Sequence, residues 1–385
     1  MILSPEILDP QDFSRIRDEW QALFDRVPGA AWSCAPEIYN CWRKALRKEP
    51  RDRIIAVRTE GGLLAGLFPV SLDHAWRGPS IAPRFDYNPS DARFVNARRK
   101  AFIPVRQATG LASLPGTMLW LGPLCREAER PAVCDAVAKA LLCLDGWDVG
   151  VFPAYTGPAM RDLRAGFVRH GAEVGEQALG REVQNVLHLK CFEDIVVGQG
   201  KKFRQNVRRA RRTAEKYGLR VSFVSGSENM ASVMPMVADL ARQSWKHEGR
   251  AGNDVNIPYH GPQQAFFEAL MTSPRLGGMP AIGLLHDAEG PIVVYLLVKT
   301  DQTVSALLTF WNGRAEKASP GLLLLGACMD WALEQGATRF DYNTTSSWVR
   351  YLADSIETVD NLVVFRPGLR GRLLGGIARL RGRVR

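Results

Sequence analysis

The feature that most constrains this fold is a pattern that occurs twice along the chain. Two apolar runs flank a short acidic turn that contains glycine, in RTEGGLLAGLFPVSL (58–72) and again in HDAEGPIVVYLLVK (286–299). Later in each half a helical pattern ends at a glycine and a strand pattern follows, in ALLCLDGWDVGVF (140–152) and CMDWALEQGATRFDY (328–342). Glycine turns are typical of β-hairpins, and glycine commonly ends a helix. Because the spacing differs between the halves, the pattern predicts two related α/β domains and not a short-period array.

Length and composition agree with two domains. The chain has 385 residues, of which 46% are hydrophobic, and single cores rarely exceed ~250 residues. We expect a first domain at residues 1–192, a second at 193–365 and a basic tail at 366–385. No run reaches the ~20 apolar residues of a membrane helix, and the N-terminal residues carry acids where a signal peptide would be basic. We therefore expect a cytoplasmic protein.

Cysteine and histidine usage argues against metal chemistry. Seven cysteines and six histidines are scattered, without a CxxC, HxxxH or HExxH pattern. We expect no metal site, and cysteines that are reduced and mostly buried.

Local patterns predict the remaining elements. Helices are expected at residues 11–26, 36–46, 131–144, 160–170 and 322–335, the last with Ser319 as its N-cap. Strands are expected at 54–58, 63–72, 120–125, 147–152, 280–286, 292–299, 303–311 and 338–342. The stretch from His74 to Pro115 is rich in Pro, Arg and Asn and is expected to be mostly loop.

The most strongly charged stretch is Lys201 to Arg220, with nine Lys or Arg residues against the single acid Glu215. Its apolar residues recur at helical spacing, and Gly218 is expected to end the helix before a strand. Cations occupy the first turn, where the helix dipole favours anions. A charged face is often only a solvated surface. The alternative is an anion site, with phosphate as the anion that Arg forks and a helix start suit best.

A carboxylate and a tyrosine hydroxyl are side chains that can serve as a general base and as a proton donor. Asp341 is expected at the carboxyl end of a strand, where a crevice usually opens, and is the candidate base or amine-orienting group. Its alternative role is to cap a loop or to pair with Arg339 or Arg350. Tyr342 and Tyr351 are candidate proton donors, although half-buried structural tyrosines are commoner.

Two further segments carry candidate contacts. In QSWKHEGRAGND, Trp245 and His247 precede a glycine-rich stretch and are candidates for substrate positioning or for a simple helix end. The tail, residues 366–385, has seven Arg, no acid and leucines at helix-like intervals. It suits either an anionic membrane surface or a frayed basic end.

Three blocks resemble a known family: the basic helix with its closing YG and strand, FRQNVRRARRTAEKYGLRV; the SPG at Ser319 to Gly321; and the helix end GATRFDY. In this order the chain resembles the GNAT acyltransferases, in the branch that joins CelD/BcsL-like exopolysaccharide-biosynthesis acetyltransferases to FemAB-like peptidoglycan aminoacyl transferases. The resemblance covers most of the chain and implies two tandem GNAT-like domains of the α+β kind, each a mostly antiparallel mixed sheet flanked by helices. The first domain would be degenerate.

The resemblance also implies site residues. The basic helix would hold phosphate through Arg204 and Arg208, with Arg211 beside them. The segment NGRAEKASPG stands where GNAT proteins bind the pyrophosphate of an acyl-CoA, which makes Arg314, Lys317, Ser319 and Gly321 the cofactor candidates, although the usual closely spaced glycines are missing. Trp348 and Arg350 stand where CelD-like sequences have a Tyr-Lys pair.

These inferences predict a GNAT-type transferase that acylates an amino group on a phosphate-bearing, nucleotide- or lipid-linked envelope precursor, with acetyl-CoA or another acyl-CoA as donor. Peripheral contact with the inner membrane face would come from the tail. One alternative is a FemAB-like transfer from aminoacyl-tRNA, which the missing glycines favour. The other is a non-catalytic module that binds phosphate or nucleic acid.

Overall fold

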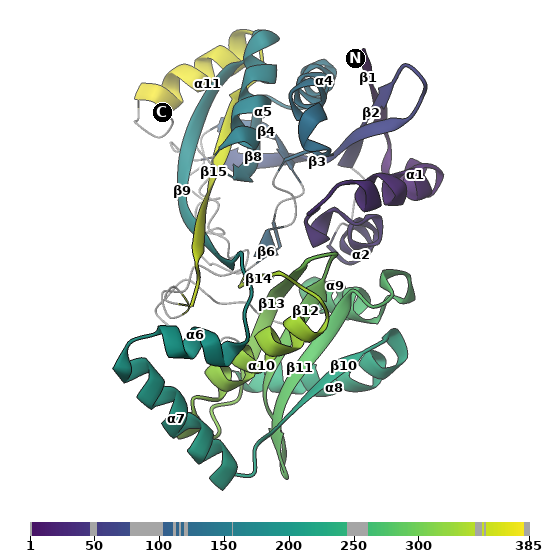
Figure 1. Cartoon of the computed structure of the whole chain (residues 1–385). Helices are drawn as coiled ribbons and strands as arrows, with labels where there is room; N and C mark the ends of the chain where they lie inside the picture. The colour runs from purple at the N-terminus through teal and green to yellow at the C-terminus, as the bar shows by residue number, and fades with distance from the viewer. Residues whose placement is uncertain are drawn as a thin grey trace.

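The repeated sequence pattern forms two matching sets of strands (Figure 1). The computed structural model describes residues 2–46, 52–77, 103–110, 113–114, 117–118, 122–155, 157–244, 261–342, 349 and 352–380. In the first half, four antiparallel neighbours are followed by a strand parallel to the fourth: β1 (Leu3–Leu8), β2 (Asp52–Thr59), β3 (Leu64–Arg77), β4 (Ile103–Gly110) and β8 (Val149–Tyr155). The second half repeats this with β10 (Arg220–Ser225), β11 (Pro280–Asp287), β12 (Gly290–Lys299), β13 (Thr303–Trp311) and β14 (Arg339–Asp341).

The last strand of each half pairs with the other half. Strand β9 (Glu173–Val186) belongs to the first half but pairs with β14, and β15 (Ser355–Phe365) belongs to the second half but pairs with β8. The two strands also pair with each other, antiparallel, so that one continuous sheet joins both halves. The proposed boundary near residue 192 stays a prediction, since exchanged strands link the halves on both sides of it.

The helices also occur at matching places. Between the first and second strands of each half, the chain forms two helices. These are α1 (Phe13–Arg26) and α2 (Pro36–Leu46) in the first half, and α8 (Ser227–Gln243) and α9 (Gly261–Thr272) in the second. The parallel strand of each half follows α4 (Arg130–Cys143) or α10 (Pro320–Glu334). The remaining helices are α5 (Pro158–Arg169), α6 (Phe192–Gly198), α7 (Lys201–Lys216) and α11 (Leu369–Leu380). Three short strands, β5 (Ser113–Leu114), β6 (Thr117–Met118) and β7 (Leu124–Cys125), complete the described β-strands.

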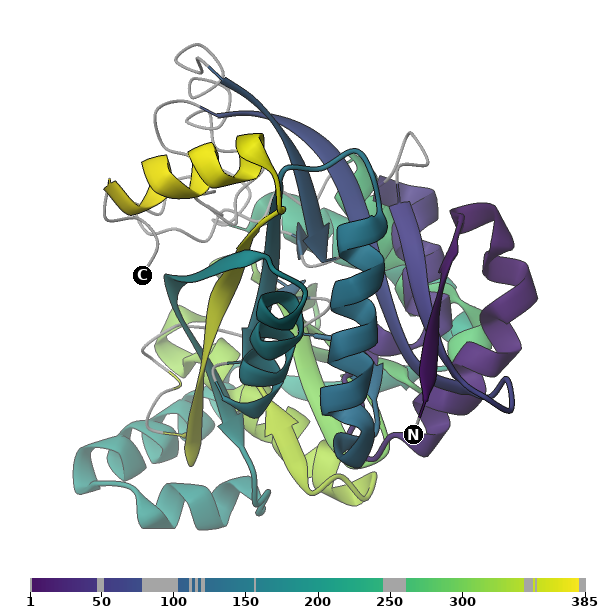
Figure 2. The ribbon, with the colours of Figure 1, turned by 90° about the horizontal axis from the view of Figure 1, so that it is seen from above.

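The helices lie on both faces of the sheet. In β14, Phe340 is buried in a core that α6, α7 and α10 share, so the next residue, Asp341, belongs to the opposite face. In β15, Val363 and Phe365 pack against α11, whereas the alternating residues belong to the main core together with α4 and α5. Figure 2 shows α11, in yellow, and α4 and α5, in teal, on either side of β15. On the face opposite α10, α2 packs against α9, and the Ser273 hydroxyl donates to Glu37 Oε1 at 3.2 Å.

Most sequence-predicted elements are confirmed, with three corrections. The expected loop from His74 contains the end of β3 and all of β4, which pair from Val70–Gly110 to Arg77–Ile103; residues 78–102 lie outside the described residues. Tertiary pairing here overrides the local Pro and Asn signal. The expected strand at 120–125 is limited, in the described part, to β7. Ser319 precedes α10 but its side chain makes no cap hydrogen bond, because the residue is left-handed with φ 47°.

Burial accounts for the cysteines. Five of the seven are buried and none is in a disulfide, as expected for small hydrophobic residues, and burial raises the pKa of the Cys34 and Cys41 thiols to about 12. Within the described residues no group of His, Cys, Asp and Glu side chains is arranged to hold a metal ion. No helix in the same residues is long and apolar enough to cross a bilayer.

Candidate functional site

Helix α7 divides its arginines between two faces. Val207 and Ala210 are buried against the core of the second half, and Gly218 ends the segment with φ 62°. Arg204 Nη1 donates to the Val197 carbonyl at 3.0 Å, and Arg211 pairs with Glu193. Two of the three predicted phosphate contacts therefore hold α7 against α6, because they lie on the flank of the helix next to its buried face.

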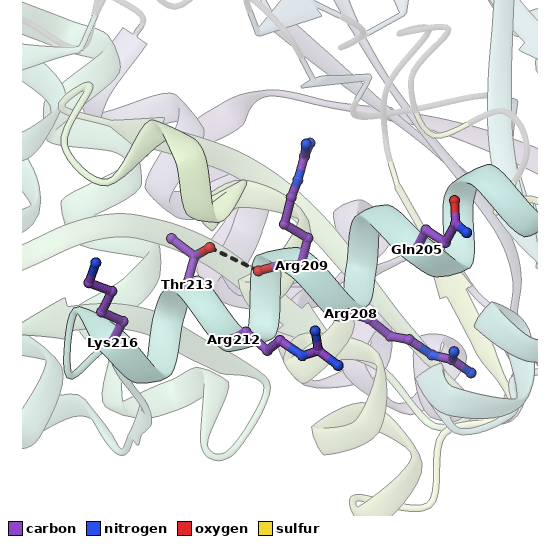
Figure 3. Close-up of a pocket in the computed structure, with 6 residues that line it drawn as sticks. All are labelled: Gln205, Arg208, Arg209, Arg212, Thr213 and Lys216. Atoms are coloured by element: carbon purple, nitrogen blue, oxygen red, sulfur yellow. Dashed lines mark hydrogen bonds between the residues drawn. The ribbon is translucent and has the colours of Figure 1, made fainter.

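The outward face of α7 is the cationic one. It forms a shallow depression of about 440 Å³ that is lined by Gln205, Arg208, Arg209, Arg212, Thr213 and Lys216. Figure 3 shows Arg208 and Arg212 extending to one side of the helix and Arg209 to the other. In the described part of the chain, none of the four cations of this open face has an ion-pair partner. Like charges at i and i+4 destabilise a helix, so local stability does not explain the series Arg208, Arg212 and Lys216.

The Arg314 side chain makes structural contacts. Its guanidinium contacts Asp287 and Glu289 at 3.2 and 2.7 Å and donates to the carbonyls of Gly290 and Pro291 at 3.1 Å each. These contacts clamp the turn between β11 and β12. In this structure these contacts use Nη1 and Nη2 of Arg314, and its role as a cofactor contact stays a prediction.

The other predicted cofactor contacts lie in an open, strained loop. Lys317 is exposed and lines a second depression of about 540 Å³ together with Tyr217 and the clamped turn. Ala315 and Ser319 are the two non-glycine residues with positive φ in the described chain, a conformation that is costly and often found at functional sites. A side chain at Gly321 would meet no atom within 4 Å. The 3-10 turn Glu316–Ala318 and α10 pack against α7, so this loop and the cationic helix are neighbours.

Asp341 lies at the end of β14, as predicted, in a row of polar side chains. Ser305, Asp341, Asn185 and Ser355 are successive register partners across β13, β14, β9 and β15, so their side chains project from one face of the sheet. The Ser305 hydroxyl donates to Asp341 Oδ2 at 3.4 Å, and Asn185 Nδ2 donates to Glu357 Oε2 at 2.8 Å. Sequence reasoning found only Asp341, since long-range strand pairing supplies its neighbours.

The sheet opens beside Asp341. The pairing of β13 with β14 ends at Ser305 and Asp341, although β13 continues to Trp311. The register with β12 also shifts there, which leaves Leu307 as an extra residue in β13. Bulges of this kind are common next to active sites, where they redirect the backbone.

Tyr342 belongs to the core. Its hydroxyl donates to the Leu352 carbonyl at 3.3 Å and lies 3.6 Å from Met329 Sδ. Burial, together with the charge of Asp354, raises its pKa above the ordinary range. In this structure the Tyr342 hydroxyl is therefore used within the core, and its role as a proton donor stays a prediction. The other predicted residues, Trp245, His247, Trp348, Arg350 and Tyr351, lie outside the described residues.

Comparison with known proteins supports a GNAT interpretation. Residues 201–351 match a family model described as an acetyltransferase (GNAT) domain. The structure resembles the C-terminal domain (DUF2156) of a protein described as a lysylphosphatidylglycerol synthetase from Agrobacterium fabrum, with a TM-score of 0.53 and 11% identity over 97% of each chain. It also resembles FemX, with a TM-score of 0.58 and 11% identity over 94% of this chain and 98% of the other. No curated protein matches the sequence.

At these identities the structural likeness establishes the fold alone, and it extends over both halves. The family match assigns a transferase type to the second half, which carries both Asp341 and the cationic face of α7. The protein thus has a GNAT-like fold and contains an acyltransferase domain.

Proposed function

We propose that this protein transfers an acyl group, with acetyl-CoA as the first candidate donor, to an amino group of a phosphate-bearing precursor of an exopolysaccharide or of the cell envelope, as in the CelD/BcsL-like proteins. Two features of one GNAT domain carry the proposal: a carboxylate beside the opened sheet, and a cationic helix face that lies next to the strained loop and has no ion-pair partner among the described residues.

Asp341 is the proposed base or amine-orienting group. Its half-buried carboxylate stands where β13 and β14 separate, and the Ser305 hydroxyl donates to one of its oxygens. Orientation of the amine against an activated carbonyl, together with proton removal by the carboxylate, supplies what this reaction requires.

The open face of α7 is the proposed phosphate site. Arg208 remains from the sequence prediction, while Arg209, Arg212 and Lys216 take the place of the partnered Arg204 and Arg211. Lys317 and the open backbone at Gly321 remain as contacts for the donor, because the strained loop packs against α7.

Acetyl transfer is tested by the release of CoA thiol in the presence of amino sugars and their nucleotide-linked forms. Asp341→Asn should lower turnover by at least ~100-fold, because loss of a general base typically costs 10²–10⁴, while the melting temperature is kept. Asp301→Asn, in an exposed turn, is the matched control. Unchanged turnover of Asp341→Asn would refute the proposed role of Asp341 as base or amine-orienting group.

One observation favours the aminoacyl-tRNA alternative. The cations from Lys201 to Lys216 extend over about 22 Å of helix axis at 1.5 Å per residue, which is more than one phosphate group can contact. Thermal stabilisation by aminoacyl-tRNA, but not by acetyl-CoA, would support it. Nucleic-acid binding with steep salt dependence and no transfer to any amine would instead indicate the non-catalytic module.

We also propose that α11 contacts an anionic membrane. Leu374 and Ala378 are buried, and Arg370 and Arg379 pair with Asp148 and Glu173 at 3.3 and 2.8 Å. The described part of the tail is thus a docked helix and not a frayed end. The opposite face presents two leucines, Leu369 and Leu373, with exposed fractions of 79% and 59%, and Arg372 is also exposed, an arrangement that suits the lipid interface.

The membrane proposal is tested by sedimentation with phosphatidylglycerol vesicles. Leu369→Ser with Leu373→Ser should reduce the bound fraction, and Leu63→Ser, in the exposed turn after β2, serves as control. Equal sedimentation of the double variant and the wild type would contradict the proposal.

A further inference from the structure

We propose that Asp341, Asn185 and Glu357 together form the binding site of the acceptor amine, and that the acceptor enters as a primary ammonium group. This inference rests on the proposed acyl transfer and specifies its substrate. It adds two residues to the site, one from the last strand of each half.

The site lies where the two halves meet. Strand β9 from the first half runs between β14 and β15 of the second, which places Asn185 directly opposite both Asp341 and Ser355. Glu357 is two residues beyond Ser355 and therefore on the same face of the sheet. That face is opposite the one on which Phe340 packs with α10.

The hydrogen bonds leave acceptors for a cationic donor. Asn185 is 4% exposed and gives its Nδ2 hydrogen to Glu357 Oε2, so its amide oxygen is directed away from that carboxylate. Within the described residues, Glu357 has no cationic partner. A primary ammonium has three N–H donors, and the site offers an oxygen from each of Asp341, Asn185 and Glu357.

Charge favours the same ligand. The chain as a whole carries a net charge of +10, yet this row brings two carboxylates onto one face of the sheet, either side of Asn185. Like charges that are close repel one another, and a partly buried carboxylate such as Glu357, which has no cationic partner among the described residues, is costly. A bound ammonium would reduce both costs, whereas a neutral hydroxyl acceptor would reduce neither.

The reaction then balances as follows. The ammonium gives one proton to a carboxylate of the site, which becomes a carboxylic acid, and leaves a neutral amine. The nitrogen lone pair attacks the donor carbonyl, a C–N bond forms, and the bond from the carbonyl carbon to the leaving group breaks. The second amine proton leaves with the thiol or hydroxyl that is released. Asp341 faces the opening in the sheet and is the proton acceptor, whereas Asn185 and Glu357 position the amine.

Methylammonium is the probe, because it carries the proposed group without the unknown body of the substrate. At 100 mM, methylammonium chloride should raise the unfolding temperature of the full-length protein by about 2 °C relative to tetramethylammonium chloride at equal ionic strength. Glu357→Gln and Asp341→Asn should each abolish this difference, while Glu334→Gln, on the exposed end of α10, should keep it. An equal effect of the two salts on the wild type would overturn the site, as would variants that retain the difference.

A second measurement uses only the wild-type protein, should a variant fail to fold. Methylammonium, but not tetramethylammonium, should protect Glu357 from esterification by a diazo compound, as measured by mass spectrometry of its peptide; absence of protection would contradict the site. If transfer is detected, Glu357→Gln should raise the KM for the amine far more than it lowers kcat, which a purely structural role would not do. Failure of every donor with every amine would refute the proposed acyl transfer, while the salt comparison would still decide whether the ammonium site exists.

Discussion

Arg314→Ala tests whether the arginine of the loop before α10 is structural or binds the donor. Its guanidinium donates to two backbone carbonyls and contacts two carboxylates, and 31% of its side chain is exposed. The Glu289 carboxylate is 80% exposed, so that pair contributes at most about 1 kcal/mol. The charged hydrogen bonds to the carbonyls and to Asp287 contribute about 1.5–3 kcal/mol. We expect a total loss of about 2–3 kcal/mol.

The assay is urea unfolding followed by tryptophan fluorescence, since Trp311 donates its indole hydrogen to the Arg314 carbonyl at 2.9 Å. The midpoint of the transition that reports on the second half should fall. Lys317→Ala is the matched control in the same loop, because the exposed Lys317 has no ion-pair partner among the described residues; its change should stay within about 0.5 kcal/mol. An unchanged midpoint in Arg314→Ala, combined with lost binding of acetyl-CoA, would refute the structural role.

Two further substitutions test the packing and the electrostatics. Burial tends to raise the pKa of Asp148, but hydrogen bonds and charge from Arg106, with the charge of Arg370, hold it below its ordinary value. Its stabilising effect is therefore complete above the unfolded pKa of about 3.9 and is lost as the pH falls through the folded pKa. Asp148→Asn should cost about 2–3 kcal/mol at pH 7, and the difference from wild type, measured by urea unfolding, should shrink below pH 4; a difference independent of pH would contradict this. Gly326→Ala should cost about 1–3 kcal/mol of unfolding free energy, because its Cβ would lie 2.4 Å from the Phe192 ring. Gly321→Ala, with open space around it, should not destabilise the protein. Equal melting temperatures of the two variants would contradict this, because they would mean that α6 can move away from the added methyl group without cost.

The sequence by itself determined the repeat, most of the helices and strands, and the positions of the charged helix and of Asp341. These follow from local periodicity and from turn residues such as Gly218 and Gly336, both of which have the expected positive φ. Local patterns are sufficient there because helix spacing and glycine stops depend on neighbouring residues.

Only the tertiary structure decided which charged groups are open and which strands are neighbours. Arg204 and Arg211 look like Arg208 in the sequence, but contacts with α6 occupy them. Asn185 and Glu357 are ordinary polar residues until the exchange of β9 and β15 places them beside Asp341. The physical reason is that side-chain alternation fixes which residues share a face of a strand, while the choice of partner strand depends on packing of the whole sheet.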